Sequence, residues 1–221
     1  MTRMLRAFLI FLLPLVLPGL AGAGKFEDIE KTVQHFERVV LMSEFTGKSV
    51  PVGKWMQPPV INVHGGKEYH KELVGLLNDL GKLTGLGFLT KKKSGKNANF
   101  DIYFKTTEEI RASTPMKRAN CAIILYQRNH AEIIQAKIYI STDSPEKTRH
   151  CIYQEVTQAL GLRNDSDIVP ESIFNDKIVR FSLTDTDRVL VRTLYDRRLK
   201  PGMTPEIASP IALGIIAEQM R

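Results

Sequence analysis

Cysteine is scarce in this chain of 221 residues, which contains only Cys121 and Cys151. The two are not arranged as C-x-x-C, and no second pair accompanies them, so the spacing typical of a zinc-binding thiolate cluster is missing. Two metal-binding thiols are therefore the weaker interpretation. In an exported chain a single pair of cysteines is most simply a disulfide, and we expect Cys121 and Cys151 to form one.

Long hydrophobic runs are also missing, which argues against a membrane span. The most apolar stretch, AFLIFLLPLVL near the N-terminus, is short and is broken by proline. Arg3 and Arg6 precede it, and small residues ending in Ala21 and Ala23 follow it. A positive segment, a short apolar segment and an A-x-A end are typical of a secretory signal peptide. We therefore expect residues 1–23 to be cleaved and the protein to be periplasmic or secreted.

The chain has no internal repeat, no low-complexity segment and no alternation of arginine with aromatic residues of the kind that binds nucleic acid. We therefore expect no nucleic-acid partner and, after signal cleavage, no membrane-spanning segment. Hydrophobic residues make up 43% of the chain, which is enough for the core of one domain. The formal net charge of +7 either serves solubility or favours contact with an acidic surface or polymer.

Apolar periodicity and capping residues predict an alternation of helices and strands. The charge run from Lys91 to Lys96 is expected to be a solvated turn, and RNH at 128–130 a tight turn between two strands. Helix starts are indicated by Ser144 with Pro145, by Thr184 or Asp185, and by TPE from Thr204. The predicted helices cover 25–45, 70–85, 144–161, 183–199 and 204–221, and the predicted strands cover 60–64, 99–106, 121–127 and 131–142.

The stretch CIYQEVTQALGL resembles, in the spacing of its residues, the zinc-peptidase helix, H-E-x-x-H followed by A-L-G-L. In those enzymes histidines at i and i+4 lie on one helical face and bind the metal, and the glutamate at i+1 takes the proton of the metal-bound water. Here Gln154 and Gln158 stand at the two histidine positions, and Glu155 stands where the base would be. In the longer form of the motif the glycine is Gly161 and the third ligand position is Asn164.

All three ligand positions therefore carry amides, which are poor zinc ligands compared with imidazole. We expect no bound metal and no cofactor. Amides both donate and accept hydrogen bonds, so a cleft lined by Gln154, Gln158 and Asn164 suits recognition of a peptide backbone. His150 shares the face of Gln154 and Gln158, and it leaves open a metal site completed by Asp165 or Asp167. The plain alternative is an ordinary amphipathic helix with no site.

The segment after this helix resembles the matrixin-like metzincin peptidases. Their closing helix reads L-x-x-x-D-x-x-x-I-x-x-L-Y-G, and their methionine-containing turn is replaced here by Ile173 or Phe174. The resemblance implies an α+β, metzincin-like (zincin-like) fold: a mixed twisted sheet, a crossover helix, a degenerate zinc-motif helix and extra N- and C-terminal helices. The residues that align with the positions of this closing-helix pattern are Leu183, Asp187, Val191, Leu194 and Tyr195.

The chain is also similar, over residues 30–208, to a bacterial exported family known as domain of unknown function 2927. The resemblance implies a Gram-negative periplasmic setting and a metzincin-like fold, and it implies no particular activity. The residues that carry it are Trp55 with Pro58, Cys121, Cys151, QEVTQALGLRNDS and LYDRRLKPGMTPEIA.

We predict an exported, non-catalytic pseudopeptidase that binds a peptide or cell-envelope component in the former active-site cleft. One alternative is an active metal-dependent peptidase with Glu155 as general base and non-standard ligands. Another is a structural envelope component that uses its N-terminal helix or its basic turn. The predicted divisions are a signal peptide at 1–23, an N-terminal helix and linker at 24–58, a metzincin-like domain at 59–200 and a helical tail at 201–221.

Overall fold

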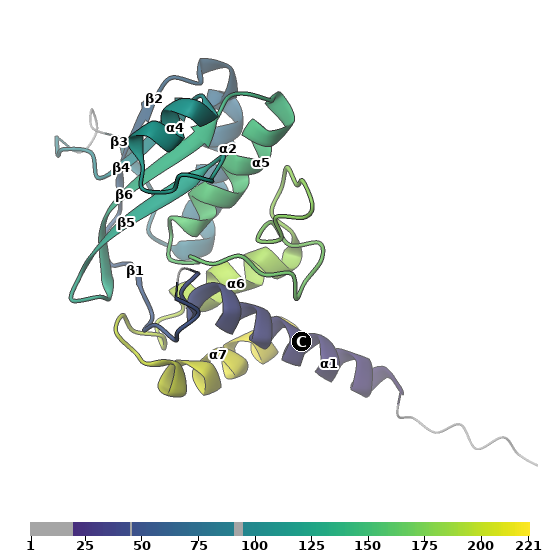
Figure 1. Ribbon diagram of the computed structural model, residues 1–221. Coiled ribbons are helices and arrows are strands. Elements are labelled where there is room, and N and C mark those ends of the chain that lie inside the picture. Colours follow the sequence, from purple (N-terminus) through teal and green to yellow (C-terminus); the bar gives the residue numbers. More distant parts are fainter. Residues whose placement is uncertain (1–19, 45, 91–94) are drawn as a thin grey trace, which may run out of the picture.

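A mostly parallel, six-stranded sheet forms the centre of the protein (Figure 1). The computed structural model describes residues 20–44, 46–90 and 95–221. The strand order is β5-β6-β4-β2-β3, and β1 pairs with the start of β6. Among the described strands, only the pair of β5 and β6 is antiparallel, and β5 forms one edge of the sheet. The strands are β1 (Lys54–Trp55), β2 (Val60–His64), β3 (Leu89–Thr90), β4 (Phe100–Lys105), β5 (Ala122–Arg128) and β6 (Glu132–Ser141).

Six α-helices and one 3-10 helix surround the sheet in the described part of the chain. Helix α5 packs on β6 and β5 and also contacts α2, whereas α4 contacts β6. Helices α1, α6 and α7 pack together below the sheet in Figure 1. The helices are α1 (Leu20–Val40), η1 (Lys67–Tyr69), α2 (His70–Thr84), α4 (Thr107–Ser113), α5 (Pro145–Gln158), α6 (Asp185–Tyr195) and α7 (Pro205–Gln219).

Each face of the sheet packs into its own hydrophobic cluster. Successive side chains of a strand point to opposite faces, so Ile138 and Ile140 enter the large core beneath α2 and α5. Tyr139, between them, packs with Ala122 and with Ile110 of α4 in a second, small cluster. The α+β class and the mixed sheet predicted from the sequence are thus confirmed.

The predicted helix starts and the predicted turn are also confirmed. Pro145 is the first residue of α5, and Thr204 precedes Pro205 at the start of α7. Thr184 caps α6 through a capping box: its hydroxyl accepts from the Asp187 amide, and the Asp187 carboxylate accepts from the Thr184 amide. Asn129 and His130 adopt positive φ angles of 52° and 56°, as the two central residues of a tight hairpin turn require.

Two predictions about helices were wrong. Helix α1 ends at Val40 instead of continuing to residue 45, because Ser43 and Lys48 form a turn in which the Ser43 amide donates to the Lys48 carbonyl. Helix α4 was not predicted, although Thr106 and Glu109 form a capping box at its start. Its single buried side chain, Ile110, gives no helical period in the sequence.

Two other predictions fall wholly or partly outside the described residues. The signal sequence lies mostly in residues 1–19, and the basic turn includes Lys91 to Lys93. Because α1 begins at Leu20, it runs through the expected cleavage point at Ala23, and the cleavage stays a prediction. Within the described residues, no helix combines the length and the apolar character that crossing a membrane requires.

Candidate functional site

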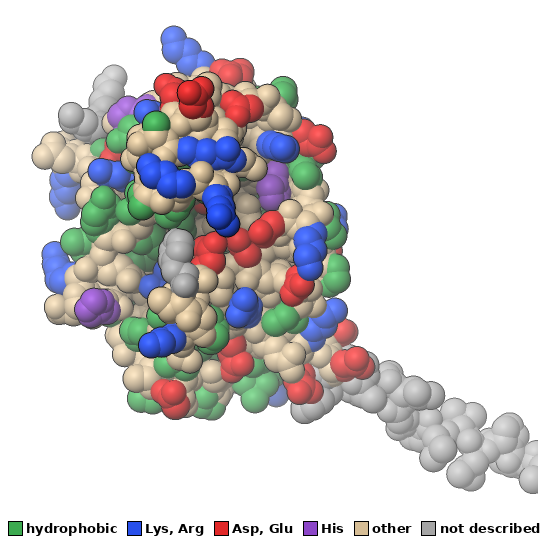
Figure 2. Space-filling model, viewed as in Figure 1, with side chains coloured by type: hydrophobic (Ala, Val, Ile, Leu, Met, Phe, Trp, Pro, Cys, Tyr) green, Lys and Arg blue, Asp and Glu red, His purple; other side chains and the backbone are tan. Residues whose placement is uncertain are grey.

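A pocket of about 850 Å³ lies between the edge strand β5 and the motif helix α5. This volume is in the range of pockets that bind small ligands or short peptide segments. Figure 2 shows this face of the protein, with acidic side chains gathered near its middle and basic side chains above them. The lining includes Ile123, Leu125 and Gln127 of β5, His150, Gln154, Glu155 and Gln158 of α5, and Glu44, Asp165 and Asp176 from loops.

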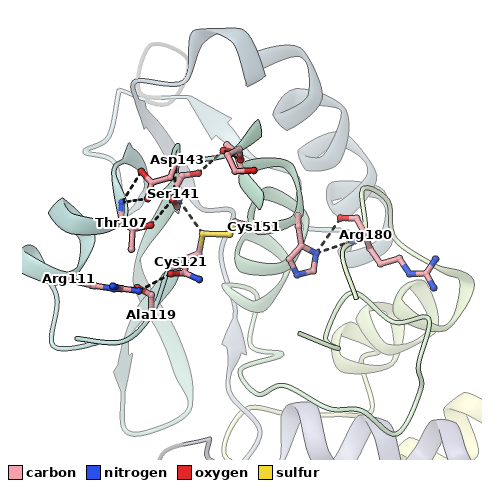
Figure 3. Close-up of a disulfide and its surroundings, with 12 residues drawn as sticks. Thr107, Arg111, Ala119, Cys121, Ser141, Asp143, Cys151 and Arg180 are labelled. Carbon is pink, nitrogen blue, oxygen red and sulfur yellow. Dashed lines mark hydrogen bonds between the residues drawn. A yellow bond between two sulfur atoms is a disulfide. The ribbon is translucent and has the colours of Figure 1, made fainter. Parts of the chain in front are cut away.

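The disulfide predicted from the sequence ties these two walls together. Cys121 directly precedes β5 and Cys151 lies in α5, and their sulfur atoms are bonded (Figure 3). The Ser141 amide at the end of β6 lies 3.2 Å from Cys121 Sγ. Because both cysteines line the pocket, the disulfide limits how far the strand and the helix can separate.

The C-terminal end of the motif helix is held by hydrogen bonds from distant residues. Trp55 Nε1 donates to the Ala159 carbonyl at 2.9 Å, and the Tyr195 hydroxyl donates to the Leu160 carbonyl at 2.8 Å. Gly161 follows with φ of 117°, and a Cβ there would overlap the carbonyl oxygen of Gly53. The glycine of the motif is therefore required by chain geometry, whether or not the site binds anything.

Gln154 and Gln158 share a single partner, the carboxylate of Asp165. Gln158 Nε2 donates to Asp165 Oδ1 at 2.7 Å, and Gln154 Nε2 donates to the same oxygen at 3.2 Å. An ionised carboxylate only accepts, so the NH₂ group of each amide faces Asp165. The amide oxygens of Gln154 and Gln158 have no hydrogen-bond partner among the described residues and remain available as acceptors.

Asn164, the third predicted cleft residue, lies elsewhere. Its side chain is 2% exposed and donates to the Arg38 carbonyl at the end of α1, and its amide N–H donates to the Val39 carbonyl. Asn164 thus fastens α1 to the chain that follows α5 and is not part of the pocket lining. Of the three residues predicted to line the cleft, Gln154 and Gln158 do line the pocket, whereas Asn164 has a structural role.

These positions do not fit the zinc ion that the metzincin resemblance implies. Each of the three amides directs its NH₂ group to an oxygen of the protein, and Asn164 is turned away from Gln154 and Gln158. His150 lines the pocket, but its Nδ1 is bonded to the main chain of Arg180, 3.1 Å from the amide nitrogen and 3.3 Å from the carbonyl oxygen. In the part of the chain that the structure describes, no three His, Cys, Asp or Glu side chains form a group that could hold a metal ion.

Glu155 is the buried ionisable group of the pocket. Its side chain is 7% exposed, and its carboxylate has no hydrogen-bond partner among the described residues. Burial, and then the charges of Asp165, Glu44 and Asp176, raise the pKa of Glu155 well above its usual value. Burial and the neighbouring Asp176 and Glu44 likewise raise the pKa of Asp165 to about 7. The pocket therefore gathers carboxyl groups where water is partly excluded, and their protonated forms are favoured.

Comparison with protein-family models shows the family of this chain. The model of the family "Protein of unknown function (DUF2927)" matches residues 30–212. The chain belongs to this family. No curated protein matches it significantly. The match covers α5 and both cysteines of this DUF2927 protein, as well as Glu44, Asp165 and Asp176.

The sequence pattern did not indicate two of the four acidic residues of this DUF2927 protein's pocket, Glu44 and Asp176. It indicated Glu155 as a base, and Asp165 only as a helper for His150. Glu44 lies in the turn after α1, and Asp176 lies in an irregular loop before α6. Neither position has a periodic pattern, and only the packing of the loops against α5 brings them to Glu155. Asp165 directly follows the third ligand position, so the motif spacing by itself could have placed it in the pocket.

Proposed function

We propose that this protein is an exported, non-catalytic, metzincin-like pseudopeptidase that binds a peptide or a cell-envelope ligand in the pocket between β5 and α5. The observation that carries the proposal is the position of Gln154, Glu155 and Gln158. These residues occupy the ligand and base positions of the zinc motif, and they line a pocket large enough for a ligand.

The architecture of the pocket supports peptide binding. Strand β5 pairs only with β6 among the described strands, so its other edge offers main-chain N–H and C=O groups. An extended peptide that adds to such an edge gains main-chain hydrogen bonds, and pockets beside the strand select its side chains. Ile123 and Leu125 supply an apolar wall, and α5 supplies the polar wall.

The residue types support the absence of catalysis. Zinc hydrolases need imidazole or carboxylate ligands, and a general base next to the metal activates the bound water. The side chains at the motif positions here are amides bonded to Asp165, so Glu155 has no activated water to deprotonate at this place. What the same residues can do is present oxygen acceptors to a ligand.

A peptide-display screen against the purified protein tests the proposal. We expect enriched peptides to bind the double variant Gln154→Ala, Gln158→Ala about tenfold more weakly or worse, because two pocket contacts and the position of Asp165 are lost. Gln135→Ala on β6, outside the pocket lining, is the matched control and should bind as the unchanged protein does. Equal affinity of the double variant for every enriched peptide would contradict the proposal.

One observation favours the alternative of an active metal-dependent peptidase. A buried carboxylate with a raised pKa and no hydrogen bond is typical of a general base, and Glu155 has these properties. The alternative predicts that the enriched peptides are hydrolysed, that a chelator stops the hydrolysis and that Glu155→Gln abolishes it. Intact peptides after long incubation with added divalent metals, followed by mass spectrometry, would exclude it for those peptides.

A further inference from the structure

The acidic cluster of the pocket, Glu44, Glu155, Asp165 and Asp176, has no cationic partner of its own. None of the four carboxylates forms an ion pair within the described residues. Arg163 also lines the pocket, but its guanidinium donates to the side chain of Gln127 and to a main-chain carbonyl. A buried carboxylate without a partner is costly, and Glu155 is more than nine-tenths buried.

The motif helix adds further acceptors beside this cluster. The NH₂ groups of Gln154 and Gln158 are used by Asp165, which leaves their two amide oxygens without a partner in the described structure. Glu155 presents two more acceptor oxygens and no donor when it is ionised. The ligand that satisfies this part of the pocket must therefore bring several N–H donors and a positive charge.

We infer that the acidic cluster binds the guanidinium or ammonium group of an arginine or lysine side chain that belongs to a bound peptide. The inference rests on the proposed peptide-binding function and specifies the residue that the pocket selects. A guanidinium brings five donors in a planar fork, and it matches carboxylate oxygens better than an ammonium does. Arginine is accordingly the preferred residue.

An organic cation fits this cluster better than a metal ion. The carboxylates come from separate elements, and no three of them, within the described residues, are grouped closely enough to hold a metal. Divalent cations need several oxygens within about 2.0 to 2.6 Å. The pocket of about 850 Å³ has room for a side chain with a planar head group instead.

A peptide fits the pocket better than a polyamine does. Lys117, Arg118 and Lys147 also line the pocket, and all three side chains are exposed, so they border its mouth. A polyamine is cationic along its whole length and would be repelled there. A peptide carries its single cationic group into the pocket, while its neutral main chain, whose carbonyls can accept from lysine or arginine, lies along the border.

The raised pKa values agree with the lack of a cationic side chain paired with these carboxyls among the described residues. Burial and mutual repulsion raise the pKa of Glu155 and bring that of Asp165 to about 7. A bound guanidinium would favour the ionised form of both groups and lower both values.

The inference is tested with fluorescent, end-blocked alanine peptides that carry one central arginine or one central citrulline, titrated with the purified protein. Citrulline keeps the shape of arginine but has no charge. We expect the arginine peptide to bind about tenfold more tightly or better, and we expect Glu155→Gln to remove this difference. Glu146→Gln, an exposed change on the same helix and outside the pocket, should leave the difference intact.

The variant Glu155→Gln is suited to the test because it removes the ionisable carboxyl group and keeps the shape of the side chain. Circular dichroism verifies its fold, and Asp176→Asn, at an exposed position of the cluster, provides a second variant with the same expected direction.

Other outcomes separate the inference from the proposed function. Equal binding of the arginine and citrulline peptides would overturn the cation site and leave peptide binding standing. Methylguanidinium or spermidine that bound as tightly as the arginine peptide would overturn the preference for a peptide. Failure of every probe to bind at millimolar concentration would overturn the inference. The proposed peptide-binding function would then be tested separately, by the display screen.

Discussion

The hydroxyl of Tyr195 donates a 2.8 Å hydrogen bond to the main-chain carbonyl of Leu160 and accepts one from the Trp55 amide at 3.3 Å. Tyr195 belongs to α6, and Leu160 lies just after α5. The bond therefore fixes the end of the motif helix to the helix that follows it in the chain.

We expect Tyr195→Phe to lower the free energy of unfolding by about 1 kcal/mol, because it leaves both main-chain groups without this partner. Urea unfolding followed by circular dichroism measures the change. Tyr126→Phe is the control, because Tyr126 is an exposed residue of β5 and its hydroxyl has no hydrogen bond within the described residues. Equal stabilities of Tyr195→Phe and the unchanged protein would contradict a role for the hydroxyl.

Gly161 should not tolerate a side chain. Its φ of 117° is strained for any other residue, and an added Cβ would overlap the Gly53 carbonyl oxygen. We expect Gly161→Ala to cost more than about 2 kcal/mol of unfolding free energy. Gly75→Ala is the matched control: Gly75 lies within α2 with open space around its Cβ position, and alanine there should stabilise by about 0.5 to 1 kcal/mol. A mild effect at Gly161 would show that the chain can move away from Gly53.

The sequence predicted elements best where local chemistry determines them. Thr184 starts α6 through a capping box, whereas Pro145 and Pro205 start α5 and α7 with a preset φ angle, and these effects act within one turn of chain. The two-residue strands β1 and β3 were missed because they show no alternation, and they exist only through pairing with distant strands. The end of α1 was predicted too late in the chain because its apolar stripe continues in sequence beyond Val40, where the chain forms a turn.

The site was predictable to the extent that one helix carries it. The spacing of Gln154, Glu155 and Gln158 on α5 is a local property, and the three residues do line one pocket. Asn164 was expected beside them on the basis of motif spacing, but the direction of its side chain depends on α1, which lies far away in sequence. Glu44 reaches the pocket from the turn after α1, where Asn164 bonds the carbonyls of Arg38 and Val39, and no local pattern reveals this contact.

Removal of the disulfide should weaken both the fold and the pocket. Cys121 and Cys151 are 30 residues apart, and closing a loop of that length stabilises by about 3 to 4 kcal/mol in the chain-entropy model. We expect a Cys121→Ser, Cys151→Ser variant to lose a comparable amount in urea unfolding, and to bind any pocket ligand more weakly because the two walls are no longer linked. Reductant should reproduce the loss in the unchanged protein and have no effect on the variant.

His35 is the centre of a buried hydrogen-bonded chain that links α1, the irregular loop after α5, and α6. Ser172 Oγ donates to Asp187 Oδ1 at 2.6 Å, so it can only accept from His35 Nε2 at 3.0 Å. His35 Nδ1 then accepts from Ser166 Oγ at 2.9 Å. Because burial lowers the pKa of His35, the imidazole is neutral at neutral pH, with its proton on Nε2.

This arrangement predicts sensitivity to acid. Burial, and then the charge of Lys31, lower the pKa of His35 to about 4, below its ordinary value near 6.5. The unfolded chain therefore binds a proton before the folded one does. Stability from His35 is complete above about pH 6.5, and it is lost as the pH falls towards about 4, by about 3 kcal/mol in total.

The measurement is the free energy of unfolding in urea at about pH 7 and about pH 4. His35→Asn should be less stable at the higher pH, because it breaks the chain to Ser166 and Ser172, but it should lose less stability on acidification. Glu155 and Asp165, whose raised pKa values favour the folded state in acid, act with the opposite sign and equally in both proteins. The difference between the two proteins therefore isolates His35, and identical pH dependence would show that the folded protein admits a charged imidazole.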